Sequence, residues 1–307
     1  HHLPQGDLPS ADIIVDPHVE PAKNGFEHYC GAGLAYKLAE LLFPCASEFL
    51  TKMQTLATVG TIADSVPLVG DNRFLVRNGL TTLKKCHSGS KAEQSIPAGL
   101  VGLLQVADVY DIDETDIGYK IGPMINAAGR MRDDGAALAF QTLTAHTIER
   151  GVQLATELQT LNEERKEETA KYEAIIEEVI ERDCLAFTQP MCVFVEDMPE
   201  GLVGILTGRI AEKYKTPAFL FTNSSEKGQL KGSGRSYNDF NLMKLVNAAM
   251  PFLIRGGGHA GAAGITVSEK NYGAMVNAMA EQMQSYELPE TDDVYYDLTV
   301  KSSDIPH

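Results

Sequence analysis

The stretch between residues 146 and 183 constrains the fold of this chain more than any other part. Charged side chains alternate there with apolar ones, and neither Gly nor Pro occurs after Gly151. The apolar side chains that recur at three or four residues are Ile148, Val152, Ala155, Leu158, Tyr172, Ile176 and Val179. This pattern predicts one amphipathic helix, which at 1.5 Å per residue spans on the order of 50 Å and could connect two domains. The alternative is a solvated face of one large domain.

The segment before this helix, residues 1–145, is predicted to be mixed α/β. Its apolar run at 12–15 has the character of a strand, and the apolar residues of 33–42 follow a helical period. The run at 56–64 fits either a helix or a strand, and it ends on a carboxylate, Asp64. Further helices are predicted at 92–107 and 132–144.

The segment after the helix, residues 184–288, alternates between strand-like and helical patterns over about 100 residues, the size of an ordinary domain. The predicted order is strand 192–195, helix 202–214, strand 218–222, strand 229–232, helix 240–250, strand 264–267 and helix 270–286. The predicted fold class is therefore α/β, with two α/β domains joined by a long helix. Residues 289–307 are predicted to be a linker or the start of a further domain.

The charge of the chain bears on its partners. A formal net charge of −16 disfavours non-specific attraction to nucleic acid, which normally needs a basic patch. The charge is unevenly spread, since acidic residues are concentrated in 157–183 and basic residues dominate 209–235. A local basic groove in an acidic protein is therefore compatible with the sequence.

Cysteine usage and hydropathy indicate a cytoplasmic protein. The five cysteines lack the paired spacing of a zinc site, which fits reduced thiols that pack in the core. They are Cys30, Cys45, Cys86, Cys184 and Cys192. No apolar run approaches the roughly 18 residues that a membrane helix needs, and residues 1–17 lack the features of a secretory signal. We therefore expect no membrane association.

Residues 256–264, Gly-Gly-Gly-His-Ala-Gly-Ala-Ala-Gly, form the most specific motif. Three consecutive glycines let backbone N–H groups approach an anion without obstruction by Cβ atoms, so a turn of this kind could cradle a phosphate. His259 strengthens this interpretation, because an imidazole can donate to a phosphate or act as an acid. The alternative is a purely structural turn.

A second polar motif, Lys-Gly-Ser-Gly-Arg-Ser at 231–236, precedes the first by about 20 residues and ends a predicted strand. It offers hydroxyl groups, accessible backbone and the guanidinium of Arg235. The planar fork of a guanidinium suits phosphate oxygens. The alternative is a polar turn with an exposed arginine.

The two motifs together resemble the DHHA1 domain, the substrate-binding half of the DHH phosphoesterases. Other segments resemble the RecJ-type, single-strand-specific exonucleases of that superfamily: His1-His2, a helix start at 30–38, a motif at 60–73, and stretches at 122–130 and 161–166. The resemblance covers about 1–285, in the family's order. It implies that 1–145 is the C-terminal part of a DHH catalytic domain, 146–183 a connecting helix and 184–288 a DHHA1 domain.

The resemblance also implies a catalytic set. His1 and Asp64 match ligands of a divalent metal, and His2 matches a histidine that faces the scissile phosphate. His259 completes the set. Carboxylate and imidazole ligands suit Mn²⁺ or Mg²⁺, and two such ions can activate water and stabilise a leaving oxygen. The alternatives are that the two histidines are a remnant of a purification tag and that Asp64 only caps a turn.

The resemblance further implies a substrate-binding set. Its members are Ser233, Arg235, Gly257, Gly258 and His259, which match groups that hold the phosphates of a nucleotide, and Arg130, which matches an arginine near the DNA path.

Some features depart from the family's pattern. No Asp precedes His1, the first two motifs of the family do not occur, and Met124 stands where these proteins usually have arginine. The sequence also stops where an oligonucleotide-binding barrel follows in RecJ. These departures predict a fragment of a longer protein, which would be nearly inactive by itself.

The resemblance implies metal-dependent hydrolysis of single-stranded DNA in the 5′-to-3′ direction, in DNA repair and recombination. The implied partners are single-stranded DNA and a single-strand-binding protein or helicase. The enzymatic alternative is a DHH phosphodiesterase that acts on short oligoribonucleotides or cyclic dinucleotides, and the non-enzymatic one is an inactive DHH relative that serves as a replication scaffold. The long helix and the motif around Asp64 favour the RecJ type.

Overall fold

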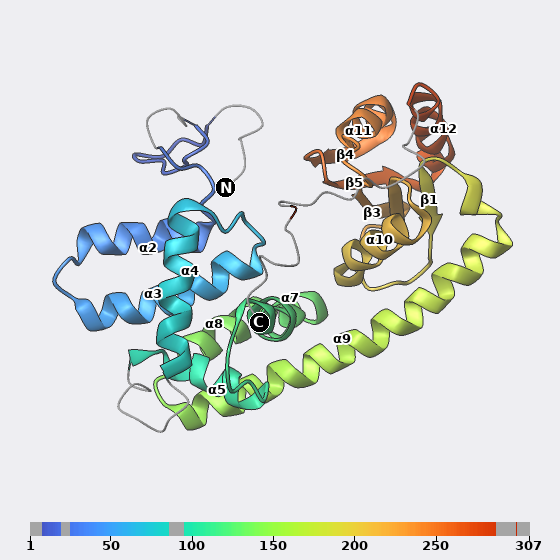
Figure 1. Cartoon of the computed structure of the whole chain (residues 1–307). Helices are drawn as coiled ribbons and strands as arrows, with labels where there is room; N and C mark the ends of the chain where they lie inside the picture. The colour runs from blue at the N-terminus through green and yellow to red at the C-terminus, as the bar shows by residue number, and fades with distance from the viewer. Residues whose placement is uncertain (1–7, 20–24, 86–94, 287–298, 300–307) are drawn as a thin grey trace. The chain divides into compact units, whose positions relative to one another are not determined.

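The computed structural model describes residues 8–19, 25–85, 95–286 and 299. The chain divides into two compact units, His1–Glu167 and Glu168–His307. Helix α9, Ile148–Arg182, contributes to both units (Figure 1). The long helix predicted over 146–183 is therefore confirmed.

The first unit consists of helices in its described part. They are α2 (Gly31–Leu42), α3 (Ser47–Ala63), α4 (Gly70–Lys84), α5 (Ala98–Val106), α6 (Glu114–Asp116), a π-helical stretch (Ile117–Ile121), α7 (Gly122–Met131), α8 (Gly135–Leu143) and the start of α9. The helices predicted at 33–42 and 132–144 are confirmed as α2 and α8, and the segment 56–64 is the end of α3. The helix predicted over 92–107 corresponds to α5, which begins at Ala98 after Pro97, and residues 92–94 lie outside the described residues.

The strand predicted at 12–15 is wrong. This segment is irregular, and Ile13 and Val15 expose 81% and 62% of their surface. A strand needs a neighbour that pairs its backbone N–H and C=O groups, and the described residues of the first unit include no strand. The α/β class of the chain is confirmed by the sheet of the second unit.

The core of the first unit requires helices to approach one another at glycines. A Cβ atom at Gly102 of α5 would lie 2.4 Å from the carbonyl carbon of Gly151 in α9. A Cβ atom at Gly151 would lie 2.7 Å from the carbonyl oxygen of Ala98. The glycine near the start of the long helix is therefore the point at which α5 crosses α9, and Ile112 and Leu158 are fully buried in the same core.

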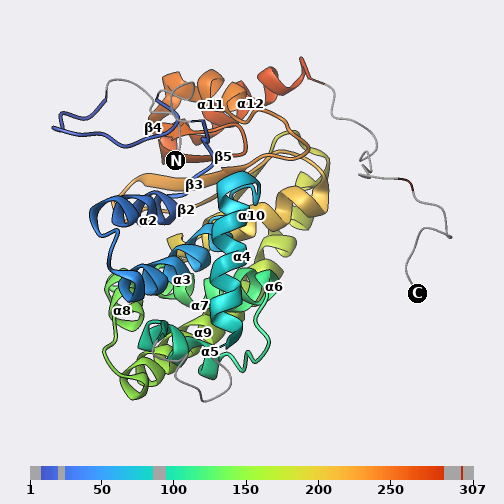
Figure 2. The same cartoon turned by 60° about the vertical axis from the view of Figure 1, so that its left-hand side comes forward.

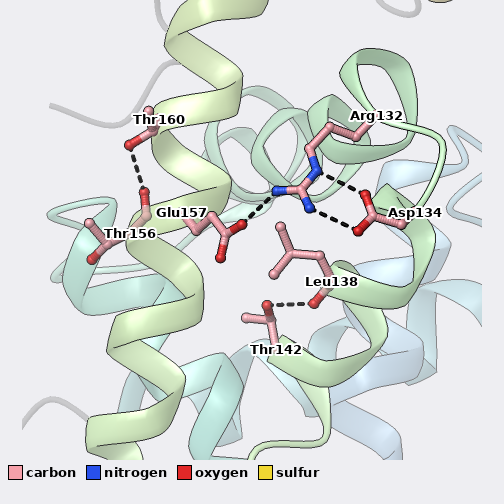
Figure 3. A network of polar contacts seen from close by, with 7 residues as sticks. All are labelled: Arg132, Asp134, Leu138, Thr142, Thr156, Glu157 and Thr160. Carbon is pink, nitrogen blue, oxygen red and sulfur yellow. Dashed lines mark hydrogen bonds and ion pairs between the residues drawn. The ribbon is translucent and has the colours of Figure 1, made fainter.

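Arg132 ties the segment between α7 and α8 to the long helix (Figure 3). Its Nε and Nη2 atoms each donate to the carboxylate of Asp134 at 2.8 Å, and Nη1 donates to Glu157 Oε1 at 2.7 Å. A bidentate arginine–carboxylate pair of this kind is stronger than an ion pair with a single hydrogen bond. Arg132 therefore has a structural role in the first unit.

The second unit contains a five-stranded sheet in the order β1-β2-β3-β5-β4. The strands are β1 (Met191–Phe194), β2 (Ala218–Asn223), β3 (Gln229–Arg235), β4 (Leu253–Gly258) and β5 (Ala262–Ser268), and the helices are α10 (Glu200–Tyr214), α11 (Met243–Ala249) and α12 (Tyr272–Met283). Strands β1 and β2 are parallel, whereas the other pairs are antiparallel. All four predicted strands and all three predicted helices of this segment are confirmed, and β4 is the strand that the sequence did not predict.

The sheet separates two layers of helices (Figures 1 and 2). One face packs on α11 and α12 around Phe219, Phe221 and Met275, which are fully buried. Helix α10 packs over β2 and β3 on the other face. Within the described part of the chain, no helix is long and apolar enough to cross a membrane.

The acidic and basic stretches of the sequence partner each other in the second unit. Glu173 of α9 pairs with Arg209 of α10, and Glu177 accepts from both Lys213 and Tyr214 at 2.7 Å. Lys231 of β3 pairs in the same way with Glu200. Three of the six cations between 209 and 235 are thus engaged by carboxylates.

The cysteine prediction is borne out only in part. Cys30, Cys45, Cys184 and Cys192 are free thiols, and Cys86 lies outside the described residues. Core packing holds for Cys30 and Cys192 but is wrong for Cys45 and Cys184, which are exposed. Burial raises the pKa of Cys192 to about 12, so this thiol stays protonated.

Candidate phosphate-binding site

The sheet of the second unit has an uncovered surface on the face that carries α10. Ser233 of β3 lies opposite Gly264 of β5, and Gly264 lies opposite Gly257 of β4. Residues directly opposite each other in a ladder point to the same face, so these three form one row across three strands. A Cβ atom at Gly257 or Gly264 would meet nothing within 4 Å. We call this row, Ser233–Gly264–Gly257, the glycine floor.

The remaining glycines of the two motifs serve the packing of the sheet. A Cβ atom at Gly232 or Gly234 would approach the rings of Phe221 and Phe219 to 2.4 Å, and one at Gly256 would approach Leu253 Cδ1 to 2.5 Å. These positions point to the buried face, because side chains alternate along a strand. Adjacent glycines therefore have different functions.

The interpretation of Gly256–Gly258 as a turn is wrong. These residues belong to strand β4, and the turn is formed by His259–Gly261. The run of glycines therefore leaves part of one sheet face without side chains, and it does not form a loop. The strand that contains Arg235 is also longer than predicted, since β3 continues past Gly232 to Arg235.

Arg235 lies beside the glycine floor against helix α10. Its Nη1 atom donates to Ser233 Oγ and to the carbonyl oxygen of Gly234, both at 2.8 Å. A Cβ atom at Gly204 of α10 would lie only 2.8 Å from Arg235 Nη2. The half-buried guanidinium is therefore held in place by β3 on one side and by a helix glycine on the other.

His259 is exposed in the turn between β4 and β5. Its backbone N–H donates to the carbonyl oxygen of Ala262 at 2.8 Å, and its Nδ1 accepts from the N–H of Gly261 at 3.2 Å. An accepting Nδ1 carries no proton, so the neutral ring has its proton on Nε2. Nε2 is then a hydrogen-bond donor.

Two further contacts fix the turn in place. The N–H groups of Ser236 and Leu242 donate to the carbonyl oxygens of Gly261 and Ala260, at 3.0 and 2.9 Å. Gly258, at the end of β4, has φ of +153°, and a Cβ atom there would lie 2.2 Å from the carbonyl oxygen of Ala262. The end of the hairpin therefore requires glycine at this position.

The structure thus brings together all five predicted phosphate-holding residues, which are Ser233, Arg235, Gly257, Gly258 and His259, on one hairpin and its neighbouring strand. Sequence reasoning missed Gly264 and Gly204. Gly264 could have been found from the alternation of β5, because Ala263, Ile265 and Val267 form a buried series that excludes it. Nothing in the sequence indicates that Gly204 approaches Arg235.

In the first unit, the predicted metal ligand Asp64 is exposed at the C-terminal end of α3. Its backbone N–H donates to the carbonyl oxygen of Gly60 at 3.0 Å, and the next residue, Ser65, has φ of +55°. Asp64 therefore ends the helix with its backbone and also lies at a cavity of about 650 Å³ between α2, α3 and α7. Asn126 lines the same cavity.

The other predicted residues of the first unit lie on or near α7. Arg130 is exposed, although desolvation by nearby protein atoms lowers the pKa of its guanidinium. Met124 lies in the core, since only 1% of its surface is exposed. A charged arginine at this position would need to leave that core, which gives Met124 a packing role here.

The described residues do not form a complete metal centre. No group of three His, Cys, Asp or Glu side chains that could hold an ion occurs among them, so Asp64 is not joined there by enough further ligands. His1 and His2 lie outside the described residues.

Comparison with known proteins places these observations in a family context. Residues 188–285 match the DHHA1 domain. The chain is 32% identical over 293 residues to the single-stranded-DNA-specific exonuclease RecJ of Haemophilus influenzae, and the match covers 89% of this chain and 49% of that protein. The crystal structure of RecJ from Thermus thermophilus in complex with Mn²⁺ matches 99% of this chain and 43% of its own, with a TM-score of 0.77 and 27% identity. The structure of that RecJ in complex with Mg²⁺ has a TM-score of 0.71 and covers 89% of this chain and 41% of its own at the same identity.

The segment of the second unit that carries the glycine floor thus lies within the match to the DHHA1 domain. The chain as a whole is RecJ-like in sequence and in fold. It spans only part of the length of the curated RecJ proteins that it matches, for example 49% of the one from Haemophilus influenzae.

Proposed function

We propose that this chain is part of a divalent-metal-dependent exonuclease that hydrolyses single-stranded DNA from the 5′ end, in DNA repair and recombination. The observation that carries the proposal is the glycine floor beside Arg235 and His259 in a DHHA1 domain. The name of the relatives, single-stranded-DNA-specific exonuclease RecJ, supports the substrate class.

The proposed binding chemistry follows from the geometry of these residues. Arg235 would bind phosphate oxygens through its planar fork, and the Ser233 hydroxyl would add one hydrogen bond. The missing side chains of Gly257 and Gly264 would let the sugar-phosphate backbone lie close to the sheet. His259 would donate from Nε2 to a phosphate oxygen.

The first unit would supply part of the catalytic centre, as the C-terminal portion of a DHH domain over 1–145. Asp64 and His1 are the proposed ligands of Mn²⁺ or Mg²⁺, with two ions in the complete enzyme, and His2 would face the scissile phosphate. Crystal structures of Thermus thermophilus RecJ in complex with each metal support this choice. Bound divalent ions would activate water for attack on phosphorus. Arg130 would lie along the path of the DNA.

The proposal extends to the setting of the protein. A cytoplasmic location, and a single-strand-binding protein or a helicase as partner, fit an enzyme that degrades single strands during repair.

A competition experiment tests the substrate class. A labelled single-stranded DNA oligonucleotide is bound to the chain and displaced by unlabelled single-stranded DNA, duplex DNA, a short oligoribonucleotide or a cyclic dinucleotide. We expect single-stranded DNA to displace the label at the lowest concentration. Stronger displacement by the oligoribonucleotide or the cyclic dinucleotide would favour a different DHH phosphodiesterase, and no binding of any of them would overturn the proposal.

A further inference from the structure

We propose that Arg255, which no motif assigns, contacts a second, more distant phosphate of the substrate, so that the strand crosses the glycine floor diagonally from Arg235 to Arg255. This inference rests on the proposed function, and it adds that tight binding requires an oligonucleotide with more than one phosphate. It predicts that the second unit distinguishes an oligonucleotide from a mononucleotide through one side chain on strand β4.

Strand register places Arg255 on the same face as the glycine floor. Arg255 lies opposite Thr266 of β5, which in turn lies opposite Lys231 of β3. Gly256 points to the buried face, where a Cβ atom would meet Leu253 and Val246, so the residues on either side of it point to the uncovered face. The ladder shifts register between Leu253 and Arg255, and irregularities of this kind re-aim the side chains beside them.

The two arginines lie at opposite corners of this face. Arg235 is opposite Ala262 of β5, whereas Arg255 is opposite Thr266, so four residues of β5 separate their positions along the strands. That offset is roughly 13 Å along the strands, and two strand spacings add roughly 10 Å across them. A separation of this size is too large for a single phosphate. The glycine floor lies between the two corners, because Gly264 is midway between Ala262 and Thr266.

The charge of Arg255 is accessible to a ligand. The residue is exposed, and among the described residues no carboxylate forms an ion pair with it. Its neighbour across the sheet, Lys231, is engaged by Glu200. Arg255 is therefore the better-placed cation at this corner for a phosphate group.

A structural role for Arg255 is the competing explanation. Strand β4 is an edge of the described sheet, and charged side chains on edge strands discourage pairing between molecules. This explanation predicts self-association of an Arg255 variant without any change in its affinity for DNA.

The experiment compares two ligands, thymidine 5′-monophosphate and single-stranded hexathymidylate, by isothermal titration to the whole chain. We expect Arg255→Ala to weaken the binding of the hexanucleotide roughly tenfold, the scale of one charge-assisted hydrogen bond. The affinity for the mononucleotide should stay unchanged. Arg255→Lys should recover part of the loss, since it restores the charge. Lys270→Ala removes an exposed cation next to α12 and should change neither affinity.

The outcome for Arg235→Ala separates this inference from the proposed function. If Arg235→Ala weakens the binding of both ligands and Arg255→Ala weakens the binding of neither, the diagonal path is wrong, but the phosphate site at Arg235 is retained. The inference is also wrong if Arg255→Ala lowers the affinity for both ligands equally, because both arginines would then bind the same phosphate. If Arg235→Ala weakens the binding of neither ligand, the phosphate-binding site lies elsewhere in the protein, and the observation that carries the proposed function is lost.

Discussion

Gly204 shows how the position of Arg235 depends on an absent side chain. We predict that Gly204→Ala weakens the binding of single-stranded DNA by about threefold to tenfold, because the new methyl group would displace the guanidinium that it approaches to 2.8 Å. The helix itself should gain about 0.5–1 kcal/mol, since alanine favours helix over glycine. Fluorescence anisotropy and thermal unfolding measure the two effects.

Gly208→Ala is the matched control for this change. It lies one turn further along α10, and a Cβ atom there would meet nothing within 4 Å. It should raise helix stability by a similar amount and leave DNA affinity unchanged. Equal affinities for both variants would mean that Arg235 is not positioned by Gly204.

At the level of elements, the crossing of α5 and α9 depends on close contact between backbones. We predict that Gly102→Ala lowers the free energy of unfolding by about 1–3 kcal/mol or more, because the added Cβ would lie 2.4 Å from the backbone of Gly151, which cannot move aside as a side chain can. Gly129→Ala in α7 adds a methyl group in open space and should be neutral or stabilising. Chemical denaturation followed by circular dichroism compares the free energies of unfolding of the two variants. Similar values would show that α5 and α9 do not cross in close contact at Gly102.

The contact between α9 and α10 should depend on pH through Glu177. Burial tends to raise the pKa of this carboxyl, but hydrogen bonds from Lys213 and Tyr214 outweigh it and lower the pKa. A lowered pKa in the folded state stabilises the protein above the ordinary value of about 4.3, and this contribution is lost as the pH falls through the folded pKa. Burial, together with the same contact to Glu177, raises the pKa of Tyr214 to about 12.

We therefore predict that Glu177→Gln lowers the unfolding temperature at pH 7 and that the difference from the parent narrows below about pH 4. Glu178→Gln removes an exposed carboxylate one residue further along and should have little effect at either pH. A constant difference between Glu177→Gln and the parent across this range would show that Glu177 does not act through its charge.

Elements with a strong local period were predictable from the sequence, whereas those defined by distant partners were not. The long helix and the strands around Phe219 and Ile265 follow their apolar periods closely. Strand β4 was missed, because Arg255 and three glycines carry no strand pattern and pair only through the register with β5. The run at 12–15 was predicted as a strand for its apolar character, but the described structure offers it no partner.

The candidate site was predictable in its residue types and not in its geometry. Ser233, Arg235 and His259 were found from the two motifs, because hydroxyl, guanidinium and imidazole groups suit phosphate. The separation of glycines into a packed set and an exposed set depends on which residues lie opposite each other in the sheet. That pairing is fixed by contacts between strands far apart in the sequence.

For the whole molecule, we predict that the chain of 307 residues shows no Mn²⁺-dependent cleavage of labelled single-stranded DNA above a buffer control. Two-metal hydrolysis needs several carboxylate ligands, and the described residues offer no cluster of three candidate ligands around Asp64. Gel analysis of the labelled DNA measures this. Robust cleavage that Asp64→Ala abolishes would show that the chain contains a complete centre.

The central claim is that the glycine floor and Arg235 bind the phosphates of single-stranded DNA, and the salt dependence of binding tests it most directly. The affinity of the parent chain, Arg235→Ala and Arg235→Lys for one single-stranded oligonucleotide is measured over a range of salt concentrations. Arg235→Ala should weaken binding by about 1.5–3 kcal/mol and flatten the slope of log K against log salt by about 0.7, the value for one lost phosphate contact. Arg235→Lys should keep the slope and recover part of the affinity, because a point charge lacks the fork. If Arg235→Ala binds with the affinity and the salt slope of the parent, the phosphate-binding site lies elsewhere in the protein.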